Sequence, residues 1–162
     1  MPDEKIVLHY FDLLEYHKQK LLEIDETISD IAYSNSNAKL LMTIPGIGTI
    51  RSLDIIAEIG EIERFPIANK FCSYAGLVPS IKQSGSMLRF GRLIKQSSKT
   101  LKYTLIETSW SIVKTKESNP LQEFYKKLAK KKGKQKAICA TARKLGCVIY
   151  AMLKNQEEFR YS

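Results

Sequence analysis

Apolar side chains recur at alternating steps of three and four residues along 6–33, and no glycine or proline interrupts them. The residues that share this spacing are Val7, Tyr10, Leu14, His17, Leu21, Ile24, Ile28 and Ile31. This is the heptad pattern of helices that pack side by side, so it predicts one long helix that pairs with another helix. On this interpretation residues 1–34 form a coiled-coil-like helix. The alternative is an amphipathic helix that packs along its own domain.

Turn-forming residues at 33–39, YSNSNAK, end this helix and mark a boundary, so a second domain is predicted at 38–162. Its first segment, LLMTIPGIGTIRSLDIIAEIG at 40–60, places a proline and two glycines between two apolar runs. This pattern predicts a helix, a tight turn at 45–48, and a second helix that ends at Gly60.

The two glycines of this turn, Gly46 and Gly48, are candidate nucleic-acid contacts. The segment resembles a helix-hairpin-helix motif, in which glycines allow a sharp turn and the first N–H groups of the second helix bind a phosphate. The alternative is a tight helix connection without a ligand. An acidic pair on the second helix, Asp54 and Glu58, argues against a DNA contact.

The rest of the chain also has helical periodicity. A short helix at 67–74, a helix from Lys99, a helix that starts near Pro120 and an amphipathic helix after Gly133 are predicted. Together with the helices of 40–60, they make the second domain compact and helical. The predicted fold class is all-α.

A serine next to a glycine, Ser84-Gly85, lies in a predicted polar turn between two of these helices. The cations near it in the sequence are Lys82, Arg89, Arg92 and Lys95. Such a serine can be an ordinary turn residue. It can also be a nucleophile, because an exposed hydroxyl among cations meets a phosphodiester whose charge those cations neutralise.

Positive charge is concentrated in the second half of the chain. Residues 1–80 carry 7 Lys and Arg against 12 Asp and Glu, whereas 81–162 carry 19 against 5, so the net charges are −5 and +14. Seven lysines fall within 126–136, among them Lys130, Lys131, Lys132 and Lys134. Lysines at this density bind phosphates without reading sequence, so nucleic acid is the predicted partner. A solvated charge run is the alternative.

Composition narrows the class of protein. With 162 residues, of which 44% are hydrophobic and 27% charged, the chain is expected to form a folded domain and not a disordered or collagen-like one. No apolar run could span a membrane and no signal peptide precedes the first helix, so a cytoplasmic location without a membrane partner is expected. The three cysteines are expected to be buried thiols, and no metal site is predicted.

Several short motifs also occur in the order seen in a known family. They are IPGIG at 44–48, AEIGEIERF at 57–65, YAGLVPSIKQSGS at 74–86, GRLIK at 91–95 and KGKQKAICATARKLGCVIYAML at 132–153. Over about residues 38–155 the chain resembles the C-terminal half of the DEDD-type transposases, the insertion-element recombinases grouped with the Piv DNA invertase. In that family an N-terminal RuvC-like domain supplies four carboxylates for a divalent metal, and the C-terminal domain carries a serine in an S-G motif. The resemblance implies that Ser84 is this catalytic serine.

Part of the family's pattern is not found in this sequence. After the serine the family usually has K-x-G-N-x-x-L-R, whereas this chain has KQSSKTLK at 95–102. No carboxylate-bearing domain precedes the heptads, and the five acids of 81–162 form no paired-carboxylate set. The chain is therefore expected to be a fragment or an orphan whose serine is inactive alone. A divalent metal is expected only with the missing DEDD domain, and no cofactor is expected in this chain.

The combined prediction is the DNA-binding and catalytic-serine domain of an insertion-element transposase, which acts in DNA recombination and transposition. DNA is the expected partner, and the resemblance implies a guide RNA for some members. The heptads predict a homodimer or a higher homo-oligomer. Two alternatives remain: a non-catalytic helix-hairpin-helix module that binds nucleic acid, and an oligomerisation domain.

Overall fold

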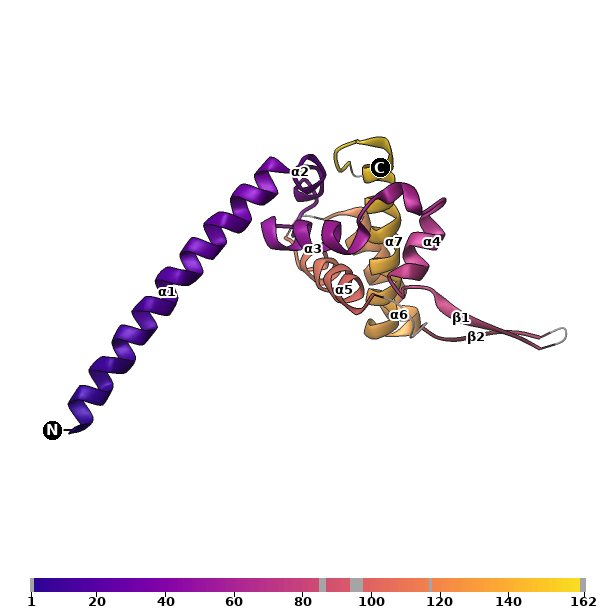
Figure 1. Cartoon of the computed structure of the whole chain (residues 1–162). Helices are drawn as coiled ribbons and strands as arrows, with labels where there is room; N and C mark the ends of the chain where they lie inside the picture. The colour runs from indigo at the N-terminus through magenta and orange to yellow at the C-terminus, as the bar shows by residue number, and fades with distance from the viewer. Residues whose placement is uncertain (1, 85–86, 94–97, 117, 161–162) are drawn as a thin grey trace.

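The computed structural model describes residues 2–84, 87–93, 98–116 and 118–160; within these ranges only the backbone is described for 2–3, 80–84 and 87–93. The elements in chain order are α1 (Pro2–Ser34), α2 (Ser36–Met42), α3 (Thr49–Ile59), a 3-10 turn η1 (Ile62–Arg64), α4 (Ala68–Tyr74), β1 (Pro79–Ser84), β2 (Met87–Leu93), α5 (Lys99–Val113), α6 (Pro120–Lys132) and α7 (Lys134–Asn155). Figure 1 shows a long N-terminal helix, a helical body and a thin hairpin of two strands that projects from the body. The predicted helical fold, with a long N-terminal helix before a compact part, is confirmed.

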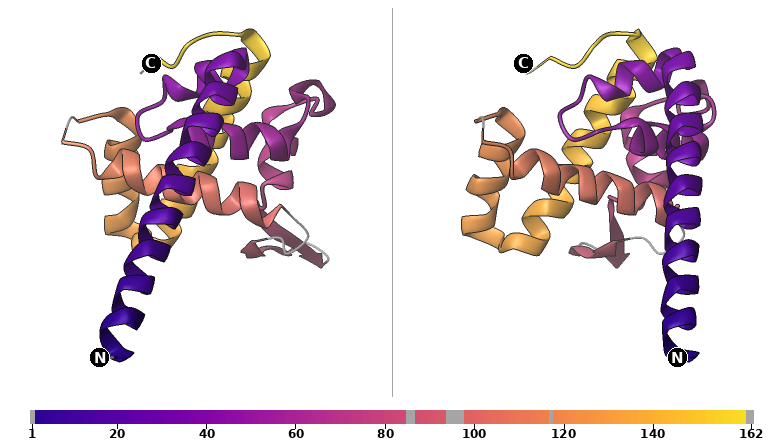
Figure 2. Two further views of the ribbon diagram at one scale, coloured as in Figure 1. Left: turned by 60° about the vertical axis from the view of Figure 1, so that its left-hand side comes forward. Right: turned by 90° about the vertical axis from the view of Figure 1, so that its left-hand side faces the viewer.

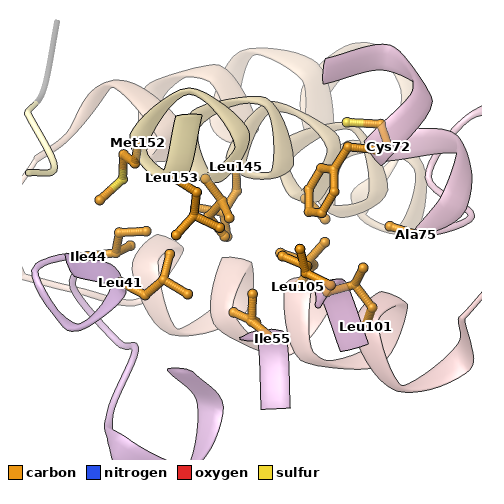
Figure 3. Close-up of a cluster of buried hydrophobic side chains, with 14 of the residues drawn as sticks. Leu41, Ile44, Ile55, Cys72, Ala75, Leu101, Leu105, Leu145, Met152 and Leu153 are labelled. Carbon is orange, nitrogen blue, oxygen red and sulfur yellow. The ribbon is translucent and has the colours of Figure 1, made fainter. Parts of the chain in front are cut away.

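The last helix, α7, runs through the middle of the body and contacts α2, α4, α5, α6 and η1. Its buried residues recur at steps of three and four, as expected for a helix with one apolar face. They are Ala137, Ile138, Thr141, Ala142, Leu145, Gly146, Ile149, Met152 and Leu153. Figure 3 shows side chains from α2, α3, α4 and α5 converging on this face. Each large apolar side chain buried in this way stabilises the fold by about 1.5–3 kcal/mol.

Helix α4 packs closely on α7 at Gly146. A Cβ atom at this position would lie 3.3 Å from Sγ of Cys72 and 3.6 Å from Cε1 of Phe71, both on α4. The absence of a side chain therefore lets the two helices pack together. Cys72 is fully buried, while Cys139 and Cys147 are partly buried, in broad agreement with the expected buried thiols.

Helix α1 contacts the body near its C-terminal end. Ala32 is fully buried against the body, but every residue of 4–27 is exposed. Its 33 residues make a rod about 50 Å long at 1.5 Å per residue. Figure 1 shows this rod extending away from the body, and in Figure 2 its N-terminal part projects beyond the other helices. The interpretation that α1 packs along its own domain is therefore wrong.

The two predicted helices around the turn at 45–48 are present as α2 and α3, and Gly60 is the C-cap of α3 as predicted. The predicted helices at 67–74, from Lys99, from Pro120 and after Gly133 are present as α4, α5, α6 and α7. Side chains cap two of these four helices, α5 and α6. Asn119, for example, caps α6 because its side chain accepts a hydrogen bond from the N–H of Gln122.

The region around Ser84 differs from the expectation of a small polar turn. It forms an antiparallel hairpin in which Ile81 pairs with Phe90, Lys82 with Arg89, and Ser84 with Met87. Two strands of six and seven residues, one of them broken by a glycine, contain too few alternating positions to reveal a sheet against a helical background. Gly85, the second half of the predicted turn, lies outside the described residues.

Both ends of the hairpin are anchored to the body. Before β1, the N–H of Leu77 donates to the carbonyl of Cys72 at 2.9 Å, and the Leu77 side chain is buried. After β2, the N–H of Ser98 donates to the carbonyl of Tyr74 at 3.0 Å. The Ser98 hydroxyl accepts from the N–H of Leu101 and donates to a carboxylate oxygen of Glu58 at 2.5 Å. These bonds hold Leu77 and Ser98, which flank the hairpin in the sequence, against α3, α4 and α5.

Candidate nucleic-acid interface

The residues predicted to bind nucleic acid fall in three places: the turn between α2 and α3, the β1–β2 hairpin, and the corner between α6 and α7. The hairpin and the α6–α7 corner lie at the same end of the body, the lower end in Figure 1 and in both views of Figure 2. The turn packs against Ser111, whereas the hairpin joins α5 at Ser98. These contacts are separated by about 20 Å along α5, at 1.5 Å per residue. The structure therefore brings two of the three candidate groups together.

Gly46 has a structural reason to be glycine. Its φ of +87° is a conformation that side chains disfavour, and a Cβ atom there would lie 2.8 Å from the Cβ of Ser111 on α5. The guanidinium of Arg51 donates to the carbonyl of Gly46 at 2.7 Å and to Oγ of Ser111 at 2.9 Å. Gly46 thus allows the turn to pack on α5, and Arg51 holds the two together.

Gly48 is in a different environment. It is the N-cap of α3 with φ −100° and ψ −170°, an extended conformation open to any residue, and a Cβ atom there would meet nothing within 4 Å. No side chain caps the helix at this end. Of the two glycines, Gly48 is therefore the one whose surroundings leave room for a ligand at the start of α3.

The acidic pair on α3 does not act as a unit. Glu58 holds the first turn of α5 through Ser98, and its carbonyl accepts from the hydroxyl of Tyr74 at 3.3 Å. Asp54, four residues earlier, is partly buried. Glu58 is thus a packing and capping residue, and its presence does not count against nucleic acid at the opposite end of α3. Sequence spacing could not reveal this role, because Ser98 lies 40 residues away.

The candidate nucleophile Ser84 is the last residue of β1, next to the tip of the projecting hairpin. On the same strand Lys82 precedes it by two positions, and Lys82 is the register partner of Arg89 on β2. Arg92 lies further along β2, toward the body. Lys95 lies outside the described residues. The backbone therefore gathers the serine and three of its four predicted cations on one arm that stands clear of the core.

The lysines of the α6–α7 corner are exposed. Lys130, Lys131 and Lys132 form the last turn of α6, and Lys134 begins α7 after Gly133, whose φ is +82°. The two ion pairs in the described part of the chain are Lys20–Glu23 and Lys154–Glu63, and neither includes a corner lysine. The positive charge of the corner is therefore available to a polyanion.

The aromatic residues near this corner are used in packing. Trp110 and Tyr125 meet edge to face with their ring centroids 5.5 Å apart, and Tyr125 is buried. Both rings therefore belong to a hydrophobic cluster that also contains Ala137 and Ile138.

The structure shows no metal centre among the residues it describes: no group of three or more His, Cys, Asp or Glu side chains could hold an ion. Cys72 and Cys147 lie with their sulfur atoms 3.6 Å apart. Burial, together with the neighbouring Cys147, raises the pKa of Cys72 to about 12. The Cys72 thiol is therefore protonated at neutral pH and unsuited to bind metal or to act as a nucleophile. Across the same described part of the chain, none of the helices has the length and apolar character needed to cross a membrane.

The sequence profile described as the transposase IS116/IS110/IS902 family matches residues 38–126, more than half of the 162-residue chain. The chain belongs to this transposase family. The matched region contains the α2–α3 turn and the whole hairpin with Ser84, but it stops before the lysines of the α6–α7 corner. The family resemblance noted from the short motifs is therefore confirmed.

Individual relatives agree with this assignment. The transposase for insertion sequence element IS1111A of Coxiella burnetii is 27% identical over 150 residues, which are 87% of this chain and 41% of that protein. The pilin gene-inverting protein of Moraxella bovis is 35% identical over 132 residues, 77% of this chain and 39% of that protein. The chain thus spans about two fifths of the length of the curated relatives it matches.

The different environments of the two turn glycines lead to a testable difference in stability. We expect Gly46→Ala to lower the free energy of unfolding by about 1–3 kcal/mol, because it combines a left-handed conformation with a clash against Ser111. Gly48→Asp is the matched variant, and it should leave stability unchanged or raise it, since Asp is a preferred N-cap. Urea denaturation of both variants measures the difference. Equal losses of stability in the two variants would contradict this assignment.

Proposed function

We propose that this chain is the DNA-binding and serine-bearing part of an insertion-element transposase, in which Ser84 attacks a DNA phosphodiester during recombination. The observation that carries the proposal is the hairpin: within the region matched to the family, it holds Ser84 and its cations on an arm outside the core. A hydroxyl in this place can approach a DNA backbone that is too wide to enter a pocket.

The proposed DNA surface extends from the hairpin to the α6–α7 corner. Both lie at one end of the body, and both carry cations. Lysines and arginines spaced along such a surface neutralise successive phosphates and release counterions, which makes binding strong at low salt and independent of sequence. Gly48, at the open start of α3, is proposed as a separate phosphate contact.

The proposed chemistry is a transesterification. Oγ of Ser84 forms a bond to phosphorus, the bond from phosphorus to a sugar oxygen breaks, and that oxygen leaves as a hydroxyl after it takes up a proton. The serine proton has to pass to a base. Cations on the hairpin, such as Lys82 and Arg89, would stabilise the extra negative charge of the transition state.

The divalent metal that the family resemblance implies does not fit the residues described here, which contain no suitable ligand group. No step of the proposal is assigned to it. An unassisted serine hydroxyl is protonated at neutral pH and is a poor nucleophile. We therefore propose that the chain alone binds DNA without cutting it, and that other parts of a complete transposase activate Ser84.

A second role, self-association through α1, is favoured by the exposure of that helix. Its exposed apolar side chains include most of the heptad positions, among them Leu14 at 66% and Ile24 at 53% exposure. Pairing of α1 with a second copy removes these side chains from water and so lowers the free energy. We propose a homodimer held by α1. A guide RNA, which the resemblance implies for some members, is a further proposed partner of the same basic surface.

The DNA-binding proposal predicts a change in salt dependence. Replacing Lys130, Lys131, Lys132 and Lys134 by Gln should weaken binding to all duplexes about equally and flatten the slope of log affinity against log salt by up to ~4 units. Fluorescence anisotropy at several salt concentrations measures the slope. The matched control replaces Lys5, Lys18, Lys20 and Lys39, at the other end of the chain, and should leave the slope unchanged. An unaltered slope in the corner variant would mean that the corner is only a solvated charge run.

A second variant, Gly48→Asp, tests whether the start of α3 belongs to the DNA interface. It keeps the helix capped but puts a carboxylate where a phosphate would bind, so it should weaken DNA binding without a loss of stability. Unchanged affinity would remove the α2–α3 turn from the proposed interface and leave the corner lysines in it.

The dimer proposal predicts the effect of two charged substitutions. Leu14→Glu combined with Ile24→Glu should convert the protein into a folded monomer, because both positions are exposed in the single chain and become buried only between helices. Light scattering measures the mass, and circular dichroism checks the fold. Glu15→Gln with Lys18→Gln, on the outer positions of the helix, is the control and should remain dimeric. A native chain that is monomeric at high concentration would contradict the proposal.

The catalytic proposal predicts inactivity followed by rescue. DNA incubated with the chain and magnesium should remain uncut. Addition of the carboxylate-bearing domain of a related transposase, in cis or in trans, should restore cleavage with protein attached to DNA. Ser84→Ala should abolish this adduct while DNA affinity is kept, whereas Ser80→Ala on the same strand should retain it. Metal-dependent cleavage by the isolated chain, or an adduct formed by the complemented Ser84→Ala protein, would overturn the assignment.

A further inference from the structure

One aromatic side chain of the body lies in solvent. Among the described residues outside α1, Tyr103 is the exposed aromatic, with 67% of its surface accessible. The body's other described aromatic rings are at least partly buried, and several pack against each other, as Phe65 does with Phe71 and Trp110 with Tyr125. Within the described part of the chain the Tyr103 side chain has no hydrogen bond or ring contact. An exposed ring without a partner is a favourable surface for a planar ligand.

Tyr103 lies one turn after the hairpin joins α5. The buried face of α5 contains Leu101, Thr104, Leu105 and Thr108, so Tyr103 stands on the outward side. Lys99 is four residues before it and shares that side of the helix. The first turn of α5 is fixed by the bonds of Ser98 to Glu58 and to the backbone of Tyr74. The ring is thus held in place beside the base of the arm that carries Ser84.

The surroundings of Tyr103 are basic. Lys102 lies on the flank of α5 that faces α7: burial raises the pKa of the Cys139 thiol there, and the ammonium of Lys102 acts against this rise. On α7, Lys136 and Arg143 lie three residues before and four residues after Cys139, and both are exposed. Arg143 donates to the side-chain oxygen of Asn69 on α4 at 3.0 Å. In the described residues none of these cations is paired with a carboxylate.

The basic strip formed by Lys99, Lys102, Lys136 and Arg143 connects the two parts of the proposed DNA surface, the hairpin and the α6–α7 corner. Lys99 and Lys102 follow the hairpin, and Lys136 comes two residues after Lys134 of the α6–α7 corner. Glu107, partly buried one turn beyond Tyr103, is the acidic residue of α5. A nucleic-acid strand that runs from the hairpin to the corner would therefore cross α5 at its first turns, where Tyr103 is exposed.

We propose that Tyr103, together with Lys99 and Lys102, is a binding site for an unpaired nucleotide of DNA: the base stacks on the phenol ring and the two ammonium groups hold the adjacent phosphates. Stacking on a protein ring requires a base whose face is free, so the site selects single-stranded or bulged DNA over a fully paired duplex. Strand exchange during recombination exposes such bases beside the cleaved bond. The inference rests on the proposed function, because it needs DNA on the same face as the hairpin.

The test compares two ligands of equal length and charge: a fully paired duplex and a duplex with a short central bulge that contains 2-aminopurine. For the full-length chain, Tyr103→Leu should weaken binding to the bulged DNA roughly five- to hundredfold, as expected for the loss of one stacked base. Its affinity for the paired duplex should change less than twofold. Tyr103→Phe should behave like the native chain, because the ring suffices. Stacking on Tyr103 should also change the 2-aminopurine fluorescence, and this change should be absent with Tyr103→Leu.

Tyr33→Leu is the matched control, since Tyr33 is exposed to a similar extent, 59%, on α1. It should bind both DNAs as the native chain does. If Tyr103→Leu binds bulged DNA normally while the corner lysine variant loses affinity, the inference is wrong and the proposed DNA interface stands. If Tyr103→Leu weakens binding to both DNAs equally, the site is a backbone contact and the selection of unpaired bases is refuted. If the native chain binds neither DNA, the proposed function fails, and this inference with it.

Discussion

Burial of α7 is the constraint on which the rest of the structure depends. Its apolar face, from Ala137 to Leu153, lies in the core, and α7 contacts α2, α4, α5, α6 and η1. At Gly146 the missing side chain brings α4 within contact of α7, and at Leu145 the core continues into α5. Because these contacts determine where α4 and α5 lie, they also determine where the hairpin between α4 and α5 begins and ends.

The hairpin has little support of its own. Two strands form an independently stable unit only when they pack on something else, and here the support is concentrated at the base. Leu77 is buried at one end, and Ser98 is bonded to Glu58 and to the backbone of Tyr74 at the other. An arm whose backbone projects from the body is compatible with the proposed attack of Ser84 on DNA.

Two features of the molecule, the α1 rod and the basic end of the body, expose side chains that have no protein partner in the described part of the chain. The rod exposes apolar side chains such as Phe11 and Leu14, and their removal from water lowers the free energy. The basic end collects lysines that the described carboxylates do not neutralise. The first surface favours another apolar helix and the second favours a polyanion.

Much of the fold followed from the sequence alone. The heptad spacing of 6–33, the turn at Gly46 and Gly48, the glycines that end α3 and α6, and the run of lysines before α7 are local patterns, and the structure contains a helix, turn or exposed surface for each. The short motifs around Ser84 also pointed to the family that the profile match established. These features depend on residues a few positions apart, where backbone geometry and side-chain period leave few choices.

Features that depend on contacts between distant residues were decided only by the tertiary structure. It shows a hairpin where a polar turn was expected at Ser84, because strands of six and seven residues contain too few alternating positions to reveal a sheet. It gave the two turn glycines different roles, since Ser111 on α5 lies against Gly46 and not against Gly48. Glu58, which on sequence alone argued against a DNA contact, is the hydrogen-bond partner of Ser98. Tyr103 is exposed to solvent, whereas Trp110 on the same helix packs against Tyr125. The sequence by itself determined which helices form and which half of the chain is basic, because both are properties of neighbouring residues; packing around α7 decided which of their side chains remain available to a ligand.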